Sequence, residues 1–278
     1  MERIKQAIEK VAQKSRNVDR DIPSSSLKST DGSEKINYTR TRVINVHDEH
    51  LANNRIVANN KTDPNSLVFD LLRTQVLQKM EENNWRTLAI TSPTPESGKT
   101  MVAINLALSI SQQLDKTAML VDFDLRRPKV ANYLGISMDK SMNDLLEGTA
   151  ELSEALVNPG IPGMVVLAPV NPIRKSSETL SSKRISDLIK DLRRYYRSRV
   201  VIFDLPPLLV IDDAMAVLPH MDCVLMVVAN GICTKQEIEE SLRYLSSSNM
   251  IGTVLNKADI EPVTKYYYSY ANPEQAGK

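Results

Sequence analysis

The sequence has little or none of several features, and each shortage excludes a class of protein. Its only two cysteines, Cys223 and Cys233, lie in or beside an apolar run and are interpreted as buried or incidental thiols rather than a disulfide or metal site, which fits a reducing compartment. The net charge of +1 gives no basic field for nucleic acid. No stretch approaches the roughly 20 apolar residues of a membrane span. We therefore expect a cytoplasmic protein that reaches a membrane only through a partner or a surface contact.

The 278 residues, 42% of them hydrophobic, suffice for one large domain with extensions. Residues 1–14 show the spacing of an amphipathic helix, which docks either on its own domain or on a partner or membrane. Residues 15–64 are rich in Ser, Asn, Asp and Thr and are predicted to form a mostly flexible linker, in which only Arg42–Asn45 suggests extended structure. The main domain is predicted at 65–260, followed by a flexible tail at 261–278.

From residue 86 onward, short apolar runs alternate with helical patterns. Strands are expected at 87–91, 117–122, 164–168, 199–204, 223–229 and 250–256, and the clearest helices at 66–82, 99–114, 177–196 and 234–246. Nearly continuous apolar strands indicate burial on both faces. The predicted fold is therefore an α/β, P-loop type domain with a mostly parallel sheet covered by helices on both faces.

The segment TSPTPESGKT (Thr91–Thr100) joins a predicted strand to a predicted helix and ends in the GKT of a phosphate-binding loop. Unpaired backbone N–H groups at a helix start bind phosphate oxygens. Lys99 is expected to reach the β- and γ-phosphates, and the Thr100 hydroxyl to bind Mg²⁺. Pro93 stands where the full pattern has glycine. The predicted nucleotide contacts here are Glu96, Ser97, Gly98, Lys99, Thr100 and the following Met101.

Acidic residues end two of the predicted strands. Asp122 and Asp124 close one of them and share a face if the strand is regular, where they could hold Mg²⁺ or accept a proton; a solvated turn is the alternative. Asp204 ends another and is typical of a Walker B strand. Asp212 and Asp213 follow before a predicted helix, and either an N-cap or a nucleotide-sensing role is open for them.

The end of the chain, KYYYSYANPEQAGK, concentrates tyrosine. Tyr266, Tyr267, Tyr268 and Tyr270 lie within five residues, out of nine tyrosines in the chain. No core element is predicted after them, so we interpret them as phosphoacceptors delivered to a neighbouring active site. The alternative is an aromatic edge strand or docking patch.

Taken together, these motifs resemble those of the bacterial tyrosine kinases, and most of all the autokinases of exosortase-linked exopolysaccharide loci. The resemblance extends from about Ser66 to the C-terminus and includes the N-terminal MERIK helix. The motifs that support it are TSPTPESGKT, AINLALSIS, VDFDLRRP, ETLSSKRISDLIKDLRRYY, VVIFDLPPLL, DDA and the tyrosine cluster.

The resemblance implies an ATP- and Mg²⁺-dependent autokinase that regulates exopolysaccharide polymerisation and export. It implies catalytic roles for Lys99, Asp122, Asp124 and Asp204, a metal shell of Thr100, Asp122 and Asp204, and nucleotide contacts from Arg126 and Asn256. The implied partners are a membrane-embedded chain-length-determinant activator, a cognate tyrosine phosphatase and further copies of the chain. The implied location is cytoplasmic, peripheral to the inner membrane through that activator.

The sequence departs from this family at two places. Glu96 replaces the first glycine of PGEGK, and since only glycine enters left-handed conformations freely, we expect altered loop geometry or nucleotide affinity. In the oligomerisation helix, the family's Glu and two Arg correspond to Leu67, Asp70 and Arg73, so only Arg73 is retained.

Three other functions remain as alternatives. A partitioning-type ATPase would carry a second lysine at the position of Thr94. A GTPase would read guanine through Asn256–Asp259, which match NKxD. A regulatory scaffold with weak catalysis would bind nucleotide without efficient phosphate transfer, and Glu96 favours it.

Overall fold

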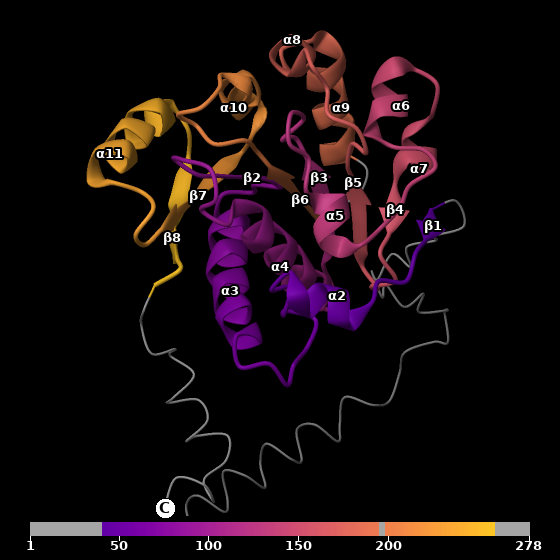
Figure 1. Cartoon of the computed structure of the whole chain (residues 1–278), viewed down its shortest axis with the longest axis horizontal. Helices are drawn as coiled ribbons and strands as arrows, with labels where there is room; N and C mark the ends of the chain where they lie inside the picture. The colour runs from indigo at the N-terminus through magenta and orange to yellow at the C-terminus, as the bar shows by residue number, and fades with distance from the viewer. Residues whose placement is uncertain (1–40, 195–197, 259–278) are drawn as a thin grey trace, which may run out of the picture. The chain divides into compact units, whose positions relative to one another are not determined.

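The computed structural model describes residues 41–194 and 198–258, which form an eight-stranded sheet between two layers of helices (Figure 1). The strand order is β1-β4-β5-β3-β6-β2-β7-β8. Neighbouring strands run parallel except β4 and β5, which are antiparallel. This confirms the predicted α/β fold with a mostly parallel sheet.

The six strands predicted from apolar runs form the body of this sheet. The strands are β1 (Arg42–Val43), β2 (Thr87–Thr91), β3 (Thr117–Asp122), β4 (Val157–Asn158), β5 (Met164–Leu167), β6 (Arg199–Asp204), β7 (Cys223–Ala229) and β8 (Met250–Asn256). Every residue of β2, β3, β6 and β7 is buried, as expected for parallel strands covered on both faces.

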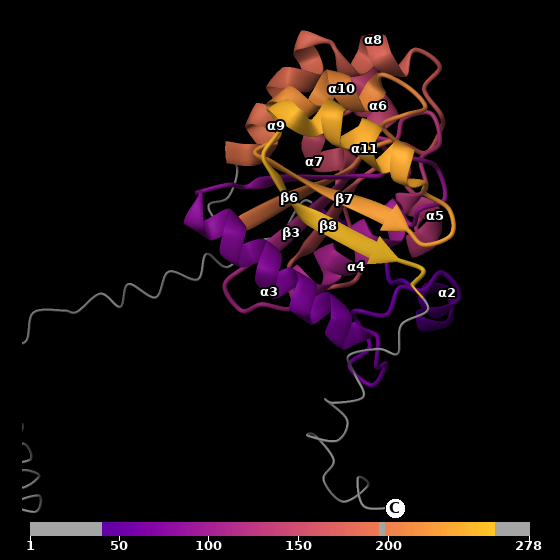
Figure 2. The same cartoon turned by 90° about the vertical axis from the view of Figure 1, so that its left-hand side faces the viewer.

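Helices cover the sheet on both sides (Figure 2). They are α2 (Asp48–Asn53), α3 (Ser66–Glu82), α4 (Lys99–Ser111), α5 (Val130–Leu134), α6 (Met142–Glu147), α7 (Leu152–Ala155), α8 (Ser176–Leu180), α9 (Lys183–Arg194), α10 (Asp213–Val217) and α11 (Lys235–Tyr244). Figure 2 shows α3 and α4 below the sheet and α9, α10 and α11 above it. Two separate apolar clusters fill the two interfaces, and each buries one face of the sheet.

Helix α4 is buried almost all round, because the sheet lies on one side of it and α3 on another. Every residue of α4 except Met101 is buried. By contrast, α9 buries only Ile185, Ile189 and Leu192, which recur at helical spacing on one face. Because α4 is enclosed in this way, its start, and with it the GKT sequence, lies inside the protein at the end of β2.

The described part of the expected linker, residues 41–64, is folded onto the domain. Strand β1 pairs with β4, and Leu51 and Ile56 are buried in the core. The fully buried side chain of Asn105 in α4 holds this segment, since its Oδ1 accepts hydrogen bonds from the backbone N–H groups of Val57 (2.8 Å) and Ala58 (2.9 Å). These few contacts hold the segment on the domain, although its polar composition suggested flexibility. Residues 1–40 lie outside the described part of the chain.

The helix expected at 177–196 is two helices, α8 and α9. The break falls at Ser181 and Ser182, and the Ser182 hydroxyl accepts a hydrogen bond from the backbone N–H of Ile185 at 3.4 Å. Serine before a helix start satisfies an N–H group that the helix leaves unpaired. In the described residues, no helix is both long and apolar enough to cross a bilayer.

Candidate active site

Three neighbouring strands bring the predicted phosphate loop and carboxylates to one edge of the sheet. Lys99 follows β2, Asp122 ends β3 and Asp204 ends β6. Strand β6 lies between β3 and β2, and Asp122 is in register with Asp204. Ligands of open α/β sheets bind at the carboxyl ends of the strands, so the sheet places these residues where a nucleotide would bind.

The loop between β2 and α4 contains two residues in the left-handed conformation. Gly98 has φ of 87°, and Glu96, which is exposed, has φ of 61°. The position where glycine was expected therefore keeps the backbone conformation that glycine favours. For a residue with a side chain, this conformation costs about 1 kcal/mol.

Lys99 lies between two carboxylates. Its Nζ is 3.0 Å from Asp124 Oδ2 and 3.4 Å from Asp204 Oδ1, and only 11% of its side chain is exposed. Burial opposes the charged form, but Asp204 and Asp124 outweigh it and raise the pKa of Lys99 above its ordinary value. The ammonium is therefore a fixed positive charge at the start of α4, as phosphate binding requires.

The residues beside Lys99 fit a magnesium ion. Thr100 Oγ1 donates a hydrogen bond of 2.6 Å to Asp204 Oδ2, so a hydroxyl and a carboxylate already lie together. Mg²⁺ prefers oxygen ligands and usually shares them with nucleotide phosphates. Accordingly, no group of three or more His, Cys, Asp or Glu in the described chain could hold an ion alone.

Asp122 and Asp124 do not share a face, because β3 ends at Asp122 and Asp124 belongs to the following loop. The Asp122 carboxylate is fully buried and accepts hydrogen bonds from the backbone N–H groups of Asp124 (3.0 Å), Lys129 (2.9 Å) and Val130 (3.0 Å). It shapes the loop, whereas Asp124 faces Lys99. Asp122 and Asp124, which the sequence suggested as a pair on one face, therefore have different surroundings and different contacts.

The two buried strand-end acids influence each other. Burial and the neighbouring Asp204 raise the pKa of Asp122 to about 8, although the Val130 N–H and Lys99 act in the opposite direction. Burial likewise raises the pKa of Asp204, against the lowering effect of Lys99 and Thr100. The site therefore favours a bound cation, which stabilises both carboxylates in their charged form.

Asn256, at the end of β8, packs over the phosphate loop. Its Nδ2 donates a hydrogen bond of 2.9 Å to the Ser97 carbonyl. A Cβ atom on Gly98 would lie only 2.2 Å from that nitrogen, so the contact requires glycine there. The predicted nucleotide role of Asn256 remains a prediction, and Asp259 of the guanine-reading pattern lies outside the described residues.

Arg126 is turned toward α8 and α10. Its Nε donates a hydrogen bond of 2.7 Å to Ser176 Oγ and lies 3.6 Å from Asp213 Oδ2. Asp213 and Ser176 are fully buried, whereas 45% of the Arg126 side chain is exposed. Asp212 occupies the N-cap position of α10 without a capping bond from its side chain; its carboxylate accepts from the Ser177 hydroxyl at 2.6 Å.

Two features of the site were not predicted from the sequence. Ser177 donates to both Asp212 and Asp213, which joins α8 to the start of α10. The Cys233 sulfur, interpreted as incidental, lies 3.4 Å from the hydroxyls of both Thr94 and Ser97 in the phosphate loop. Residues far apart in sequence make these contacts, so no local pattern indicates them.

The residues of α3 that match the family's oligomerisation helix are used within the domain. Asp70 Oδ1 accepts from Arg73 (2.8 Å) and from the Ser109 hydroxyl (2.6 Å), and Lys61 lies 2.8 Å from the other oxygen. Asp70 and Arg73 thus fix α3 to α4, and Asp70 also fixes it to the preceding segment through Lys61.

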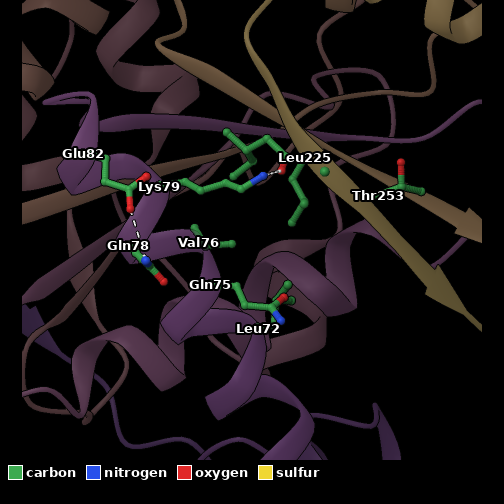
Figure 3. A pocket seen from close by; sticks show the side chains of 10 residues that line it. Leu72, Gln75, Val76, Gln78, Lys79, Glu82, Leu225 and Thr253 are labelled. Carbon is green, nitrogen blue, oxygen red and sulfur yellow. Dashed lines mark hydrogen bonds between the residues drawn. The ribbon is translucent and has the colours of Figure 1, made fainter.

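An open pocket lies away from these residues. It has a volume of about 390 Å³ between α3 and β7–β8 (Figure 3). Lys79 crosses it and donates a hydrogen bond of 2.7 Å to the Ile251 carbonyl. None of the phosphate-loop or carboxylate residues lines it. The predicted phosphoacceptors Tyr266, Tyr267, Tyr268 and Tyr270 lie outside the described residues.

Comparison with known proteins identifies several relatives. The tyrosine-protein kinase CpsD of Streptococcus pneumoniae is 32% identical over 187 residues, which cover 65% of this chain and 79% of CpsD. The tyrosine-protein kinase Etk of Escherichia coli K12 is 32% identical over 203 residues, covering 71% of this chain but 27% of Etk. No family model matches the chain.

Solved structures agree in fold. The kinase domain of E. coli Etk superimposes with a TM-score of 0.61 at 30% identity, covering 69% of this chain and 76% of that one. The kinase domain of VpsO gives 0.62 at 29% identity, covering 69% and 96%. The septum site-determining protein MinD of Pyrococcus horikoshii gives 0.53 at 19% identity, covering 64% and 74%, and shares the fold alone.

Proposed function

The chain belongs to the bacterial tyrosine-protein kinases, and on that premise we propose that it is an autokinase that transfers the γ-phosphoryl group of ATP to tyrosines of its own C-terminal tail. The observation that supports this most is the position of Lys99. It lies between Asp124 and Asp204, with the Thr100 hydroxyl on the second carboxylate. A fixed cation, a metal ligand pair and a nearby carboxylate are the parts that phosphoryl transfer requires.

Each residue has a distinct task in the proposed reaction. Lys99 binds the β- and γ-phosphate oxygens of the substrate ATP. Thr100 and Asp204 would hold Mg²⁺, which would supply positive charge to the phosphates. The tyrosine oxygen bonds to the γ-phosphorus, the bond from that phosphorus to the β–γ bridging oxygen breaks, and ADP leaves. Asp124 accepts the phenol proton, because its carboxylate faces Lys99 whereas the Asp122 oxygens accept three backbone N–H groups.

The proposed acceptors are Tyr266, Tyr267, Tyr268 and Tyr270 of a neighbouring chain. The described chain ends shortly after Asn256, which touches the phosphate loop, so the tail starts close to the site. A segment starting this near must double back to enter its own site, which favours delivery to another copy. Tethering raises the local concentration of acceptors, and each phosphate adds nearly two negative charges.

The proposed role is control of exopolysaccharide polymerisation and export. A membrane-embedded chain-length-determinant protein would activate the kinase and draw it to the inner membrane from the cytoplasm, and a cognate phosphatase would reset it. The family membership and the motif resemblance support this setting.

One alternative function is supported by a specific observation. Glu96 places a carboxylate and a left-handed backbone in the phosphate loop, which favours a nucleotide-binding scaffold with weak catalysis. The partitioning-type ATPase is disfavoured, because Thr94 stands where those proteins carry a second lysine.

The test is autophosphorylation with ATP and Mg²⁺, with and without the membrane activator. We mix Lys99→Met chains having intact tails with active chains whose four tail tyrosines are Phe. Phosphate on the Lys99→Met tail is expected and supports transfer between chains. If the intact active protein incorporates phosphate but mass spectrometry finds none at residues 266–270, the tail is not the substrate. If it incorporates none even with activator, the scaffold function replaces the kinase.

A further inference from the structure

We propose that Arg126, together with Arg127, Arg174 and Lys175, forms a phosphotyrosine subsite beside the active site. This inference rests on the proposed function and adds a property to it. The subsite binds a tail tyrosine of a second copy that is already phosphorylated, and this places a neighbouring tyrosine at the site of transfer. These four residues are called the arginine rim below.

The anchoring of Arg126 is the first observation. Its Nε is held by the buried Ser176 hydroxyl at 2.7 Å and lies 3.6 Å from Asp213 Oδ2. That carboxylate oxygen is buried and accepts no hydrogen bond within the described part of the chain. A guanidinium fixed through Nε presents its two terminal amino groups as a pair, the geometry that binds a phosphate in two places.

The terminal amino groups of Arg126 remain available. No hydrogen bond among the described residues engages them, and 45% of the side chain is exposed. Arginine anchored at one end loses little conformational freedom on binding an anion, since its fork is already oriented. Arg126 is thus prepared for an anionic group that arrives from solvent.

The second observation is that two cationic loops lie side by side. The Ile173 N–H donates a hydrogen bond of 2.8 Å to the Leu125 carbonyl, which joins the loop after β5 to the loop after β3. The segments LRRPK (125–129) and PVNPIRK (169–175) of these loops contain no carboxylate. Asp124, which precedes the first segment, is buried and faces Lys99. Arg127, Arg174 and Lys175 are exposed.

Two acidic residues near the arginine rim already have hydrogen-bond partners. Asp212 and Asp213 both accept from the Ser177 hydroxyl, and Asp213 also faces Arg126. Glu178, on α8, is exposed. The exposed charge of the two loops is therefore positive, and a dianionic phosphotyrosine complements it better than an uncharged tyrosine does.

The arginine rim lies directly beside the proposed transfer site. The Arg127 N–H donates to the Asp124 carbonyl at 3.1 Å, and the Asp124 carboxylate contacts Lys99 at 3.0 Å. In an extended peptide, adjacent residues are only about 3.3 Å apart along the chain. In the proposed complex, one of Tyr266–Tyr268 and Tyr270 occupies the arginine rim while another reaches Asp124. Phosphorylation of one tail tyrosine then accelerates phosphorylation of the next.

The experiment compares two peptides of the tail sequence VTKYYYSYANPEQ, one unmodified and one carrying a single phosphate on Tyr268. The enzyme is the full chain with its own four tail tyrosines changed to Phe, so that the signal comes from the peptide alone. With saturating ATP and Mg²⁺, we expect kcat/KM for the phosphorylated peptide to be about tenfold higher, mainly through a lower KM.

The Arg174→Ala/Lys175→Ala variant should lose this advantage while phosphorylating the unmodified peptide within about twofold of the parent. The matched control is Lys183→Ala/Lys190→Ala, which removes two exposed cations from α9 and should keep the advantage. Equal use of both peptides by the parent, or an advantage that survives in the Arg174/Lys175 variant, overturns the proposal.

A binding measurement separates this inference from the kinase assignment. Fluorescence anisotropy of labelled peptides, without ATP, should show tighter binding of the phosphorylated peptide to the parent and not to the Arg174/Lys175 variant. If neither peptide is phosphorylated by the enzyme, the proposed function fails, yet this preference still supports the subsite. If transfer occurs but the parent shows no preference in binding, the subsite fails alone.

Discussion

The phosphate loop and the arginine rim both contain a residue that contacts Asp124, but they are built differently. The loop is held by backbone geometry and burial, with Gly98 packed under Asn256 and Lys99 enclosed by acids. In the arginine rim, Arg126 is held by one side-chain hydrogen bond to the buried Ser176 and by its proximity to Asp213, and the other three residues are exposed.

This difference teaches that nucleotide binding and acceptor selection can be separated by mutation. Changes in the loop alter a dry, tightly packed environment, where removing one charge leaves others unpaired. Changes in the arginine rim alter groups in contact with water, where single interactions contribute less. Five predictions test this separation, beginning with the largest effect.

Lys99→Met should abolish phosphorylation and weaken ATP binding severely, because methionine supplies no charge to the phosphates. Binding of a fluorescent ATP analogue and incorporation of labelled phosphate measure the two effects. Lys190→Met, on the exposed face of α9, is the matched control and should behave as the parent. Normal activity in a folded Lys99→Met protein would show that the loop is not the nucleotide site.

Asp124→Asn and Asp204→Asn should each lower the transfer rate by about a hundredfold or more, since they remove charge near the transition state. Asp122→Asn should lower the rate similarly, and should also reduce stability by about 1–3 kcal/mol, because an Asn side chain cannot accept from all three N–H groups that Asp122 satisfies. Single-turnover rates and denaturant unfolding distinguish the effects. An Asp122→Asn protein as stable as the parent would contradict the loop-shaping role.

Asp213→Asn should lower phosphorylation of a phosphorylated tail peptide by about tenfold without changing ATP affinity. The substitution keeps the shape at the start of α10 but removes the charge beside Arg126. Nucleotide titration and peptide kinetics on the same preparation make the comparison. A parallel loss of ATP affinity would mean that Arg126 serves the nucleotide side.

Stability without nucleotide should fall as pH rises from about 4 to about 8. The folded-state pKa of Asp122 is raised to about 8 from an ordinary value of 3.8, so in this window the folded protein binds more protons than the unfolded chain. One such proton corresponds to about 1.4 kcal/mol per pH unit. Unfolding of the parent and Asp122→Asn across this range measures the slope, which should be smaller in the variant. A parent with flat stability would contradict the raised pKa.

Glu96→Gly and Glu96→Gln separate two effects of one residue. Glycine relieves the left-handed strain at φ 61°, but it also loses more entropy on folding, so the net stability change should stay below about 1 kcal/mol. Both variants should bind ATP a few-fold more tightly, because both remove a carboxylate near the phosphates. Tighter binding by the glycine variant only would assign the effect to the backbone.

The sequence predicted the parts of this site whose signals are local. All six expected strands are present, because strands buried on both faces need continuous apolar runs, and acids at their ends stand out. The GKT sequence at the start of α4 was recognisable for the same reason.

The remaining features depend on contacts between distant segments. The pairing of β1 with β4 and the clamp of Asn105 on residues 57 and 58 fold a stretch whose composition favours flexibility. Similarly, the different surroundings of Asp122 and Asp124 arise because β3 ends between them. A rule based on alternation within a strand does not apply beyond that end.

The pairing of β1 with β4 also has a consequence for how the protein folds. Arg42 lies opposite Val157, so this pair closes a loop longer than a hundred residues and forms only after β4 has been made. Contacts of such long sequence separation form late in folding. Strand β1 is exposed and only two residues long, so it is also an early element to open. During synthesis and in local unfolding, the segment around Arg42 and Val43 is therefore the part of the sheet that joins last and leaves first, and hydrogen exchange should be fast there and slow in β6.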